Sequence, residues 1–148
     1  MLAQRLLMEG QTAKAREVLA MSEKMLPVSN IPYEENDYQL AQIWLQAGNA
    51  KKAGEIATAV AKYNAQYLDW LNSLSYNDLT SYASSCARAL RNLYSAISVL
   101  DAAKVPQAQL YTARLKQLTG TQAGNIGAQA LEQMMQQPQA PEADGSEE

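Results

Sequence analysis

The sequence LAQRLLMEGQTAKAREVL at residues 2–19 recurs as LAQIWLQAGNAKKAGEIA at residues 40–57. The identical residues all keep one offset of 38 positions; the pairs are Leu2/Leu40, Ala3/Ala41, Gln4/Gln42, Leu7/Leu45, Gly10/Gly48, Lys14/Lys52, Ala15/Ala53 and Glu17/Glu55. A fixed period, with an apolar stripe on each side of a glycine turn, is typical of stacked helical hairpins. The sequence therefore predicts an all-α fold of antiparallel hairpins.

Helical spacing of apolar residues continues on both sides of this repeat. Gly10, Gly48 and Gly120 are typical helix ends, and the prolines at 27 and 106 cannot continue a helix. We expect about six helices, at residues 1–9, 12–26, 34–47, 50–74, 77–105 and 107–118. The first segment has no capping residue before it, as if its first turn belonged to a longer protein.

The C-terminal part of the chain carries weaker signals. Gly124 and Gly127 interrupt residues 121–136, so this segment is predicted to be weakly helical. Residues 137–148 combine two prolines, small residues and four acids, a composition that predicts disorder. The predicted organisation is a helical repeat domain at 1–120, an extension at 121–136 and an acidic tail at 137–148.

Several side chains have both a structural and a functional interpretation. Glu34, Glu35 and Asp37 are placed where the positive end of a helix dipole favours acids, an interpretation preferred to a metal or acid/base site. An apolar stripe is formed by Ala53, Ile56, Val60, Tyr63, Tyr67, Trp70 and Leu74. Tyr67, Trp70 and Leu71 cluster near its end and are interpreted as core or inter-helix packing rather than as a ligand-stacking box. A heptad-like seam follows, formed by Leu79, Ala83, Cys86, Leu90, Leu93, Ile97 and Leu100, with Cys86 as a small buried hydrophobe.

Composition excludes several classes of function. The formal charge is −3, and because four of the fifteen acids lie in the tail, residues 1–141 are close to neutral. This body offers no basic footprint for nucleic acid or anionic lipid. No apolar run approaches the roughly 20 residues of a membrane span, so no direct insertion is expected. The chain has no histidine and a single cysteine, so we expect no metal, no cofactor and no catalytic residue.

The repeat resembles the tetratricopeptide pattern, in which small residues let two helices cross closely. The first copy carries the resemblance on Leu2, Ala3, Leu6, Gly10, Ala15, Leu19 and Pro27, and the second on Leu40, Ala41, Trp44, Gly48 and Ala53. The usual period is about 34 residues, and the segment PVSNIP at 27–32 accounts for the longer one here. The resemblance covers residues 1–57 and implies a stacked array; residues 58–120 are predicted helical without a repeat family.

A second resemblance concerns short motifs around this array. Pro32-Tyr33 and Tyr67-Leu68-Asp69 resemble the soluble C-terminal region of large bacterial multi-spanning membrane proteins of unknown function, whose membrane part is similar to protein O-mannosyltransferases. This resemblance implies an accessory domain whose catalytic partner lies outside this chain. It leaves the side of the membrane open, with the extracytoplasmic side favoured.

In such arrays the first helix of each hairpin lines a concave surface. The positions that would face it are Gln4, Met8, Glu35, Tyr38, Gln42 and Gln46. Amide side chains donate and accept hydrogen bonds, which suits the backbone of an extended peptide, although solvated helix positions explain them equally well. The surface lacks the clustered Lys or Arg of a carboxylate clamp.

The function predicted first is therefore a protein-interaction module that binds a protein, a peptide or its own membrane-embedded parent. The alternatives are a structural domain that self-associates through the seam, or a free-standing adaptor. An enzyme is the least favoured class, because its best candidates, Tyr38 with Glu35, have no base or metal partner.

Overall fold

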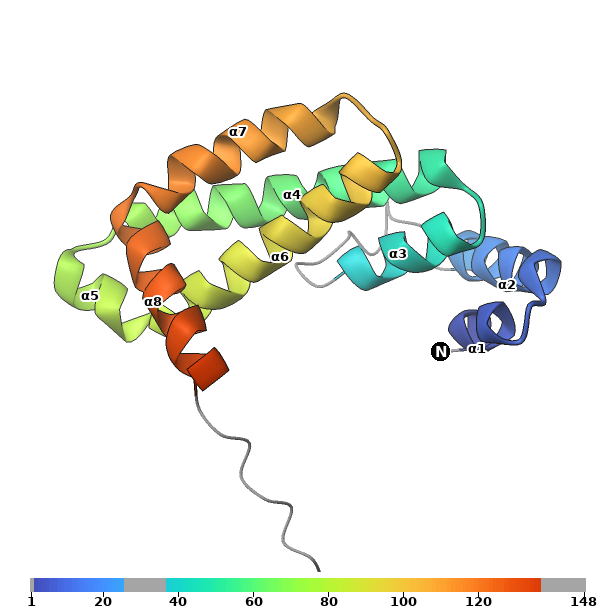
Figure 1. The fold of residues 1–148 in the computed structure, drawn as a ribbon, viewed down its shortest axis with the longest axis horizontal. Helices are drawn as coiled ribbons and strands as arrows, with labels where there is room; N and C mark the ends of the chain where they lie inside the picture. Colours follow the sequence, from blue (N-terminus) through green and yellow to red (C-terminus); the bar gives the residue numbers. More distant parts are fainter. Residues whose placement is uncertain (1, 26–36, 137–148) are drawn as a thin grey trace, which may run out of the picture.

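The computed structural model describes residues 2–25 and 37–136, and this part of the chain consists of eight α-helices with no strand (Figure 1). The helices are α1 (Leu2–Met8), α2 (Thr12–Met25), α3 (Tyr38–Gln46), α4 (Ala50–Asn72), α5 (Tyr76–Ser81), α6 (Ala83–Ala102), α7 (Gln107–Thr119) and α8 (Gln122–Gln136). The all-α prediction is confirmed. The predicted disordered tail lies outside the described residues.

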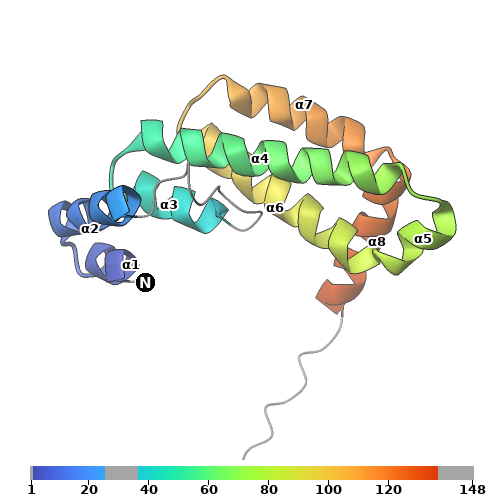
Figure 2. The same ribbon diagram turned by 180° about the vertical axis from the view of Figure 1, so that it is seen from behind.

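Six of the helices pair into three antiparallel hairpins, α1 with α2, α3 with α4, and α6 with α7. The first helices contact one another in order, α1 with α3 and α3 with α6, while α4 contacts both α6 and α7. Figures 1 and 2 show α1 and α2 at one end of the molecule, with α5 and α8 at the other. The prediction of stacked hairpins is confirmed, and α8 closes the stack by packing on α6.

The three hairpins share one type of turn. Gly10, Gly48 and Lys104 adopt positive φ values of 76°, 86° and 57°. In each turn this residue donates its N–H to the carbonyl three positions earlier, and the next residue donates to the carbonyl five positions before itself. These are the two hydrogen bonds of a Schellman motif. In the third hairpin a lysine holds the position where the first two hairpins have glycine, so the glycine signature of the turn does not extend to it.

The core runs along the interface between α4 and α6. Ile56, Val60, Leu68 and Leu71 of α4 are fully buried. The seam on α5 and α6 is buried as well, since Leu79, Cys86, Leu93 and Leu100 expose no surface. Small residues permit the close crossings predicted from the repeat: the four alanines Ala3, Ala15, Ala41 and Ala53 are all fully buried.

The helix predicted at residues 77–105 is interrupted. Tyr82 has φ −103° and ψ 21°, and it separates the short α5 from α6. The start also differs from the predicted range: α5 begins at Tyr76 and is capped by Ser75, whose hydroxyl accepts a hydrogen bond from the Asp78 N–H at 3.3 Å. The start of α3 shifts in a similar way, because this helix begins at Tyr38 and Asp37 is its N-cap residue. Glu34 lies outside the described residues.

The apolar stripe predicted on α4 holds only for its first half. Tyr63 and Trp70 are about half exposed, at 46% and 47%, whereas Leu68 and Leu71 fill the core. Because α6, α7 and α8 all contact α4, its buried face is wider than the predicted stripe. In the second half of the helix this face includes Asn64, Leu68 and Leu71 in place of Tyr63 and Trp70. Leu71 lies in the core, whereas Trp70 is half exposed and makes inter-helix packing, stacked on Tyr67 and edge-on to Tyr82.

The segment predicted to be weakly helical is the continuous helix α8. Gly124 and Gly127 are buried, and an added Cβ on Gly127 would meet Leu90 Cδ1 at 2.7 Å and the backbone of Cys86 at 2.9 Å. Asn72, at the end of α4, caps α8: its Oδ1 accepts from the Ala123 N–H at 2.9 Å, and its Nδ2 donates to Thr121 Oγ1 at 3.0 Å. The glycines therefore permit close packing rather than weakening the helix.

Candidate functional site

Four of the residues predicted to face a concave surface lie around one hollow. Gln4 of α1 and Tyr38, Gln42 and Gln46 of α3 line a cavity of about 730 Å³. Met8 is 83% exposed on α1 but does not line this hollow. Glu35 lies outside the described residues.

Close approach of two helices forms the hollow. The repeat-equivalent alanines Ala3 and Ala41 are fully buried, so that α1 and α3 meet without large side chains between them. On α3, Ala41 and Trp44 face the core, while Gln42 and Gln46 are exposed on another side of the helix. The hairpin repeat thus places one glutamine, Gln4 or Gln42, next to each buried alanine.

Sequence reasoning missed four lining residues, Asp37, Gln39, Leu40 and Ile43. Gln39 could have been found, because it precedes Gln42 by three positions and shares its side of the helix. Leu40 and Ile43 contribute to the hydrophobic core and also border the hollow.

The chemistry of the α1–α3 hollow is that of a neutral, hydrogen-bonding surface. Its described lining residues include four glutamine amides and one acid, Asp37, and they include neither Lys nor Arg. Each amide offers two donors and an acceptor carbonyl. Leu40, Ile43 and the ring of Tyr38 supply apolar contact between them. This arrangement suits reversible binding of a polar chain, and no nucleophile–base pair is present among these lining residues.

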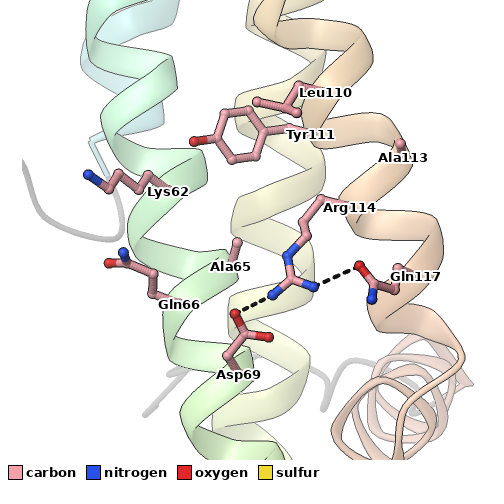
Figure 3. Close-up of a pocket in the computed structure, with 9 residues that line it drawn as sticks. All are labelled: Lys62, Ala65, Gln66, Asp69, Leu110, Tyr111, Ala113, Arg114 and Gln117. Atoms are coloured by element: carbon pink, nitrogen blue, oxygen red, sulfur yellow. Dashed lines mark hydrogen bonds and ion pairs between the residues drawn. The ribbon is translucent and has the colours of Figure 1, made fainter.

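A second hollow of about 430 Å³ lies between α4 and α7, which run side by side (Figures 1 and 3). Lys62, Gln66 and Asp69 come from α4, and Tyr111 and Arg114 project toward them from α7. Arg114 pairs with Asp69 and donates to Gln117 Oε1 at 2.8 Å. No local sequence pattern indicates this site, because it forms only through the packing of α7 beside α4.

Aromatic rings form a row on the surface near the end of α4. Tyr63, Tyr67 and Trp70 stack at centroid distances of 6.4 and 5.8 Å, and Tyr82 meets Trp70 edge-on at 5.9 Å. Each contact between two of these rings contributes about 0.5–1.5 kcal/mol of stabilisation. The row is thus explained as packing at the junction of α4 with the start of α6.

Cys86 occupies the interior, as its position on the seam predicted. The side chain is fully buried, and burial raises the pKa of the thiol above its usual value. A thiol that stays protonated is a poor nucleophile and a poor metal ligand. The described residues contain no cluster of three or more His, Cys, Asp or Glu side chains placed to share a metal ion.

None of the described helices combines the length and the apolar character that a membrane crossing requires. Comparison with known proteins gives no match to a protein-family model, to a curated protein or to a solved structure. The description of the chain as a helical-repeat fold therefore depends on its internal copy, its repeated turns and the packing of its hairpins.

Proposed function

We propose that the chain is a protein-interaction module that binds an extended peptide segment in the α1–α3 hollow. The observation that carries this proposal is the convergence of four glutamine amides, from two repeat-related helices, on one cavity of about 730 Å³. An extended backbone presents donors and acceptors on alternate sides, which side-chain amides can match in either direction.

The charge of the hollow narrows the partner. Asp37 is the one charged residue among the described lining residues, so an acidic segment would meet no compensating cation. A neutral or basic peptide is therefore favoured, and capture of a free carboxylate terminus is disfavoured. Catalysis is not part of the proposal, and any reaction would belong to a partner or a parent protein.

We further propose that this module is an accessory part of a larger membrane-anchored, glycosyltransferase-like protein. The support is the resemblance of Pro32-Tyr33 and Tyr67-Leu68-Asp69 to such proteins. Sequencing the reading frame upstream of Met1 tests it: several apolar segments of about 20 residues would support the proposal. A stop codon directly before Met1 would favour a free-standing adaptor instead.

Self-association remains the alternative function, but the seam is not exposed to serve as its surface. The seam Leu79–Leu100 was the candidate interface, but its large side chains are buried against α4 and α8 within one chain. Self-association through the seam would require the monomer to open. The peptide-binding proposal is accordingly preferred.

Selection of peptides from a random display library on the purified chain tests peptide binding. Selected peptides should bind the native chain and lose roughly tenfold or more in affinity to the Gln4→Ala/Gln42→Ala double variant, because two hydrogen bonds of about 0.5–1.5 kcal/mol each are removed. Gln129→Ala, an exposed glutamine change on α8, is the matched control and should bind normally. Equal affinity for all three proteins would contradict the proposal.

A further inference from the structure

A further hollow lies on the surface where α6, α7 and α8 meet, and we call it the α6–α8 hollow. Figure 1 shows α8 crossing α6 just after the chain leaves α7, and each of these three helices contacts the other two. The hollow has a volume of about 510 Å³ and shares no lining residue with the α1–α3 or the α4–α7 hollow.

The floor of this hollow is apolar, and its rim is both apolar and exposed. Leu90 is buried, and Leu115 and Leu131 are half-buried against the core. Three large side chains at the rim are uncovered: Tyr94 at 65%, Met134 at 48% and Met135 at 86% exposure. Contiguous exposed apolar surface of this kind marks a site of interaction on a protein. We therefore expect another molecule to cover this face.

The residue types around the hollow are those of a protein–protein interface. Tyrosine, methionine and arginine are enriched at such interfaces, whereas Lys, Glu and Asp are depleted. The lining residues that the structure describes include Tyr94, two methionines and Arg91, and they include no Lys, Asp or Glu. Methionine side chains are flexible and adapt to irregular apolar surfaces. A protein surface therefore suits this hollow better than a polar solute does.

Met135 and the hollow form a projection and a cavity on one face of the molecule. Met135 belongs to the rim, and its side chain is the most exposed of the lining residues named above. Two copies related by a two-fold axis can therefore each insert Met135 into the hollow of the other. A patch that is complementary to itself in this way is the requirement for an isologous dimer interface.

Opposite charges flank the hollow and select the orientation of the two copies. Arg91 is an exposed residue of the α6 wall. Glu132 is exposed on α8, one helical turn from the lining residues Ala128 and Met135. If the two-fold axis runs along the hollow, the α8 wall of one copy lies over the α6 wall of the other, and Arg91 faces Glu132 twice. An axis across the hollow would oppose like charges instead.

We propose that the α6–α8 hollow is the interface of a symmetric homodimer. Met135 of each copy enters the hollow of the other, and Arg91 of each copy pairs with Glu132 of the other. The dimer leaves the α1–α3 hollow free, since α1 and α8 lie at opposite ends of the molecule (Figure 1). Self-association through this face does not require the buried seam to open, and it does not depend on peptide binding.

Sedimentation velocity of the full chain tests the dimer. We expect the mass to rise from 16.2 kDa toward twice that value as the concentration increases from about 1 to about 300 μM. Met135→Asp should weaken dimerisation about 100-fold or more, because a charge would enter an apolar hollow twice in each dimer. Met8→Asp, at a methionine of α1 with a similar exposure of 83%, is the matched control and should dimerise normally. Circular dichroism checks that both variants keep the native helix content.

Charge reversal tests the orientation. Arg91→Glu and Glu132→Arg should each weaken dimerisation about tenfold, because like charges then face each other at two places. An equimolar mixture of these two variants should recover the native affinity, because each chain supplies the charge that the other has lost. An effect confined to one chain could not be recovered by mixing. A chain that stays monomeric, equal dimerisation of Met135→Asp and Met8→Asp, or a mixture no tighter than its components would overturn the proposal.

Discussion

At the scale of single residues, Gly10 and Gly48 are equivalent in backbone but differ in surroundings. Both have positive φ, yet an added Cβ would meet open space at Gly10 and would clash with the Arg16 guanidinium at Gly48. Arg16 also donates from Nε to the Ala47 carbonyl, so the second turn is a contact point for α2. Glycine thus permits only the turn conformation in the first hairpin, whereas in the second it also leaves room for Arg16 of the neighbouring hairpin.

Gly10→Ala and Gly48→Ala should therefore differ in their cost. The left-handed backbone alone disfavours alanine by about 1–2 kcal/mol, and Gly48→Ala should cost more because Arg16 must move. Urea denaturation followed by circular dichroism measures both free energies of unfolding. In an Arg16→Ala background the two costs should become similar; an unchanged difference would show that the Arg16 contact is irrelevant.

Lys104 occupies the same position of the third turn, although it is not a glycine. Its φ of 57° is unfavourable for a residue with a Cβ, so Lys104→Gly should stabilise the chain. We expect a gain of about 0.5–1 kcal/mol, because relief of the left-handed strain is partly offset by the greater freedom of glycine in the unfolded chain. Lys104→Ala is the control for loss of the charge, and thermal unfolding should show no gain for it.

At the scale of elements, α8 shows how packing can reverse a local preference. Gly127 is a poor helix former, and propensity alone predicts that Gly127→Ala stabilises by up to about 1 kcal/mol. The structure predicts the opposite sign, since the new Cβ would press on Leu90 and on the backbone of Cys86. We expect a loss of about 1–3 kcal/mol, as for overpacked cores.

The measurement is chemical denaturation, read together with the reactivity of the Cys86 thiol toward a disulfide reagent. Because α8 covers the α6 backbone at Cys86, Gly127→Ala should also speed thiol labelling in native buffer. Ala128→Gly, at an exposed position of α8, is the matched control: it should cost about 1 kcal/mol through propensity and leave labelling less affected. Stabilisation by Gly127→Ala would refute this account of the crossing.

The elements that the sequence predicted well are those whose signals are local. The 38-residue copy, the glycine turns and the apolar spacing specify α1 to α4 without knowledge of the rest of the chain. The failures came from tertiary contacts. Gly127 packs against α6, and the contacts of α4 with α6, α7 and α8 leave Tyr63 and Trp70 outside its buried face. The turn at Lys104 is a local exception, because a lysine takes the positive φ that usually identifies a glycine.

The α1–α3 and α4–α7 hollows also differ in how far local sequence signals predict them. Gln4 and Gln42 could be predicted to lie together because the repeat relates them, and the α1–α3 hollow contains both. The α4–α7 hollow depends on Asp69 and Arg114, which are 45 residues apart and have no repeat relation. Only the packing of α7 beside α4 brings these two side chains together.

At the scale of the whole molecule, burial is unevenly distributed along the stack. α4 and α6 each bury residues along their whole length against several helices, whereas the described side chains of α1 and α2 bury mainly Ala3, Ala15 and Leu19. The first hairpin joins the rest through the contact of α1 with α3 and through Arg16. In stacked arrays, stability is roughly a sum of unit and neighbour terms, so a weakly joined end unit can open alone.

We therefore expect amide hydrogen exchange of α1 and α2 to proceed through local opening, at a free energy below that of α4 and α6. Arg16→Ala should lower protection in α1 and α2 further, because it removes their contact with the Ala47 carbonyl, and should leave α6 protection unchanged. Native-state exchange followed by NMR resolves the two groups of amides. If both groups exchange at one global free energy, the stack is a single cooperative unit and this prediction is wrong.

If the two free energies differ, opening of the first hairpin also opens the α1–α3 hollow, because Gln4 on α1 is one of its lining residues. Peptide binding in the α1–α3 hollow should then protect α1 amides selectively, because a ligand that binds only the closed state stabilises it. The proposed function would thus depend on the least stable part of the fold.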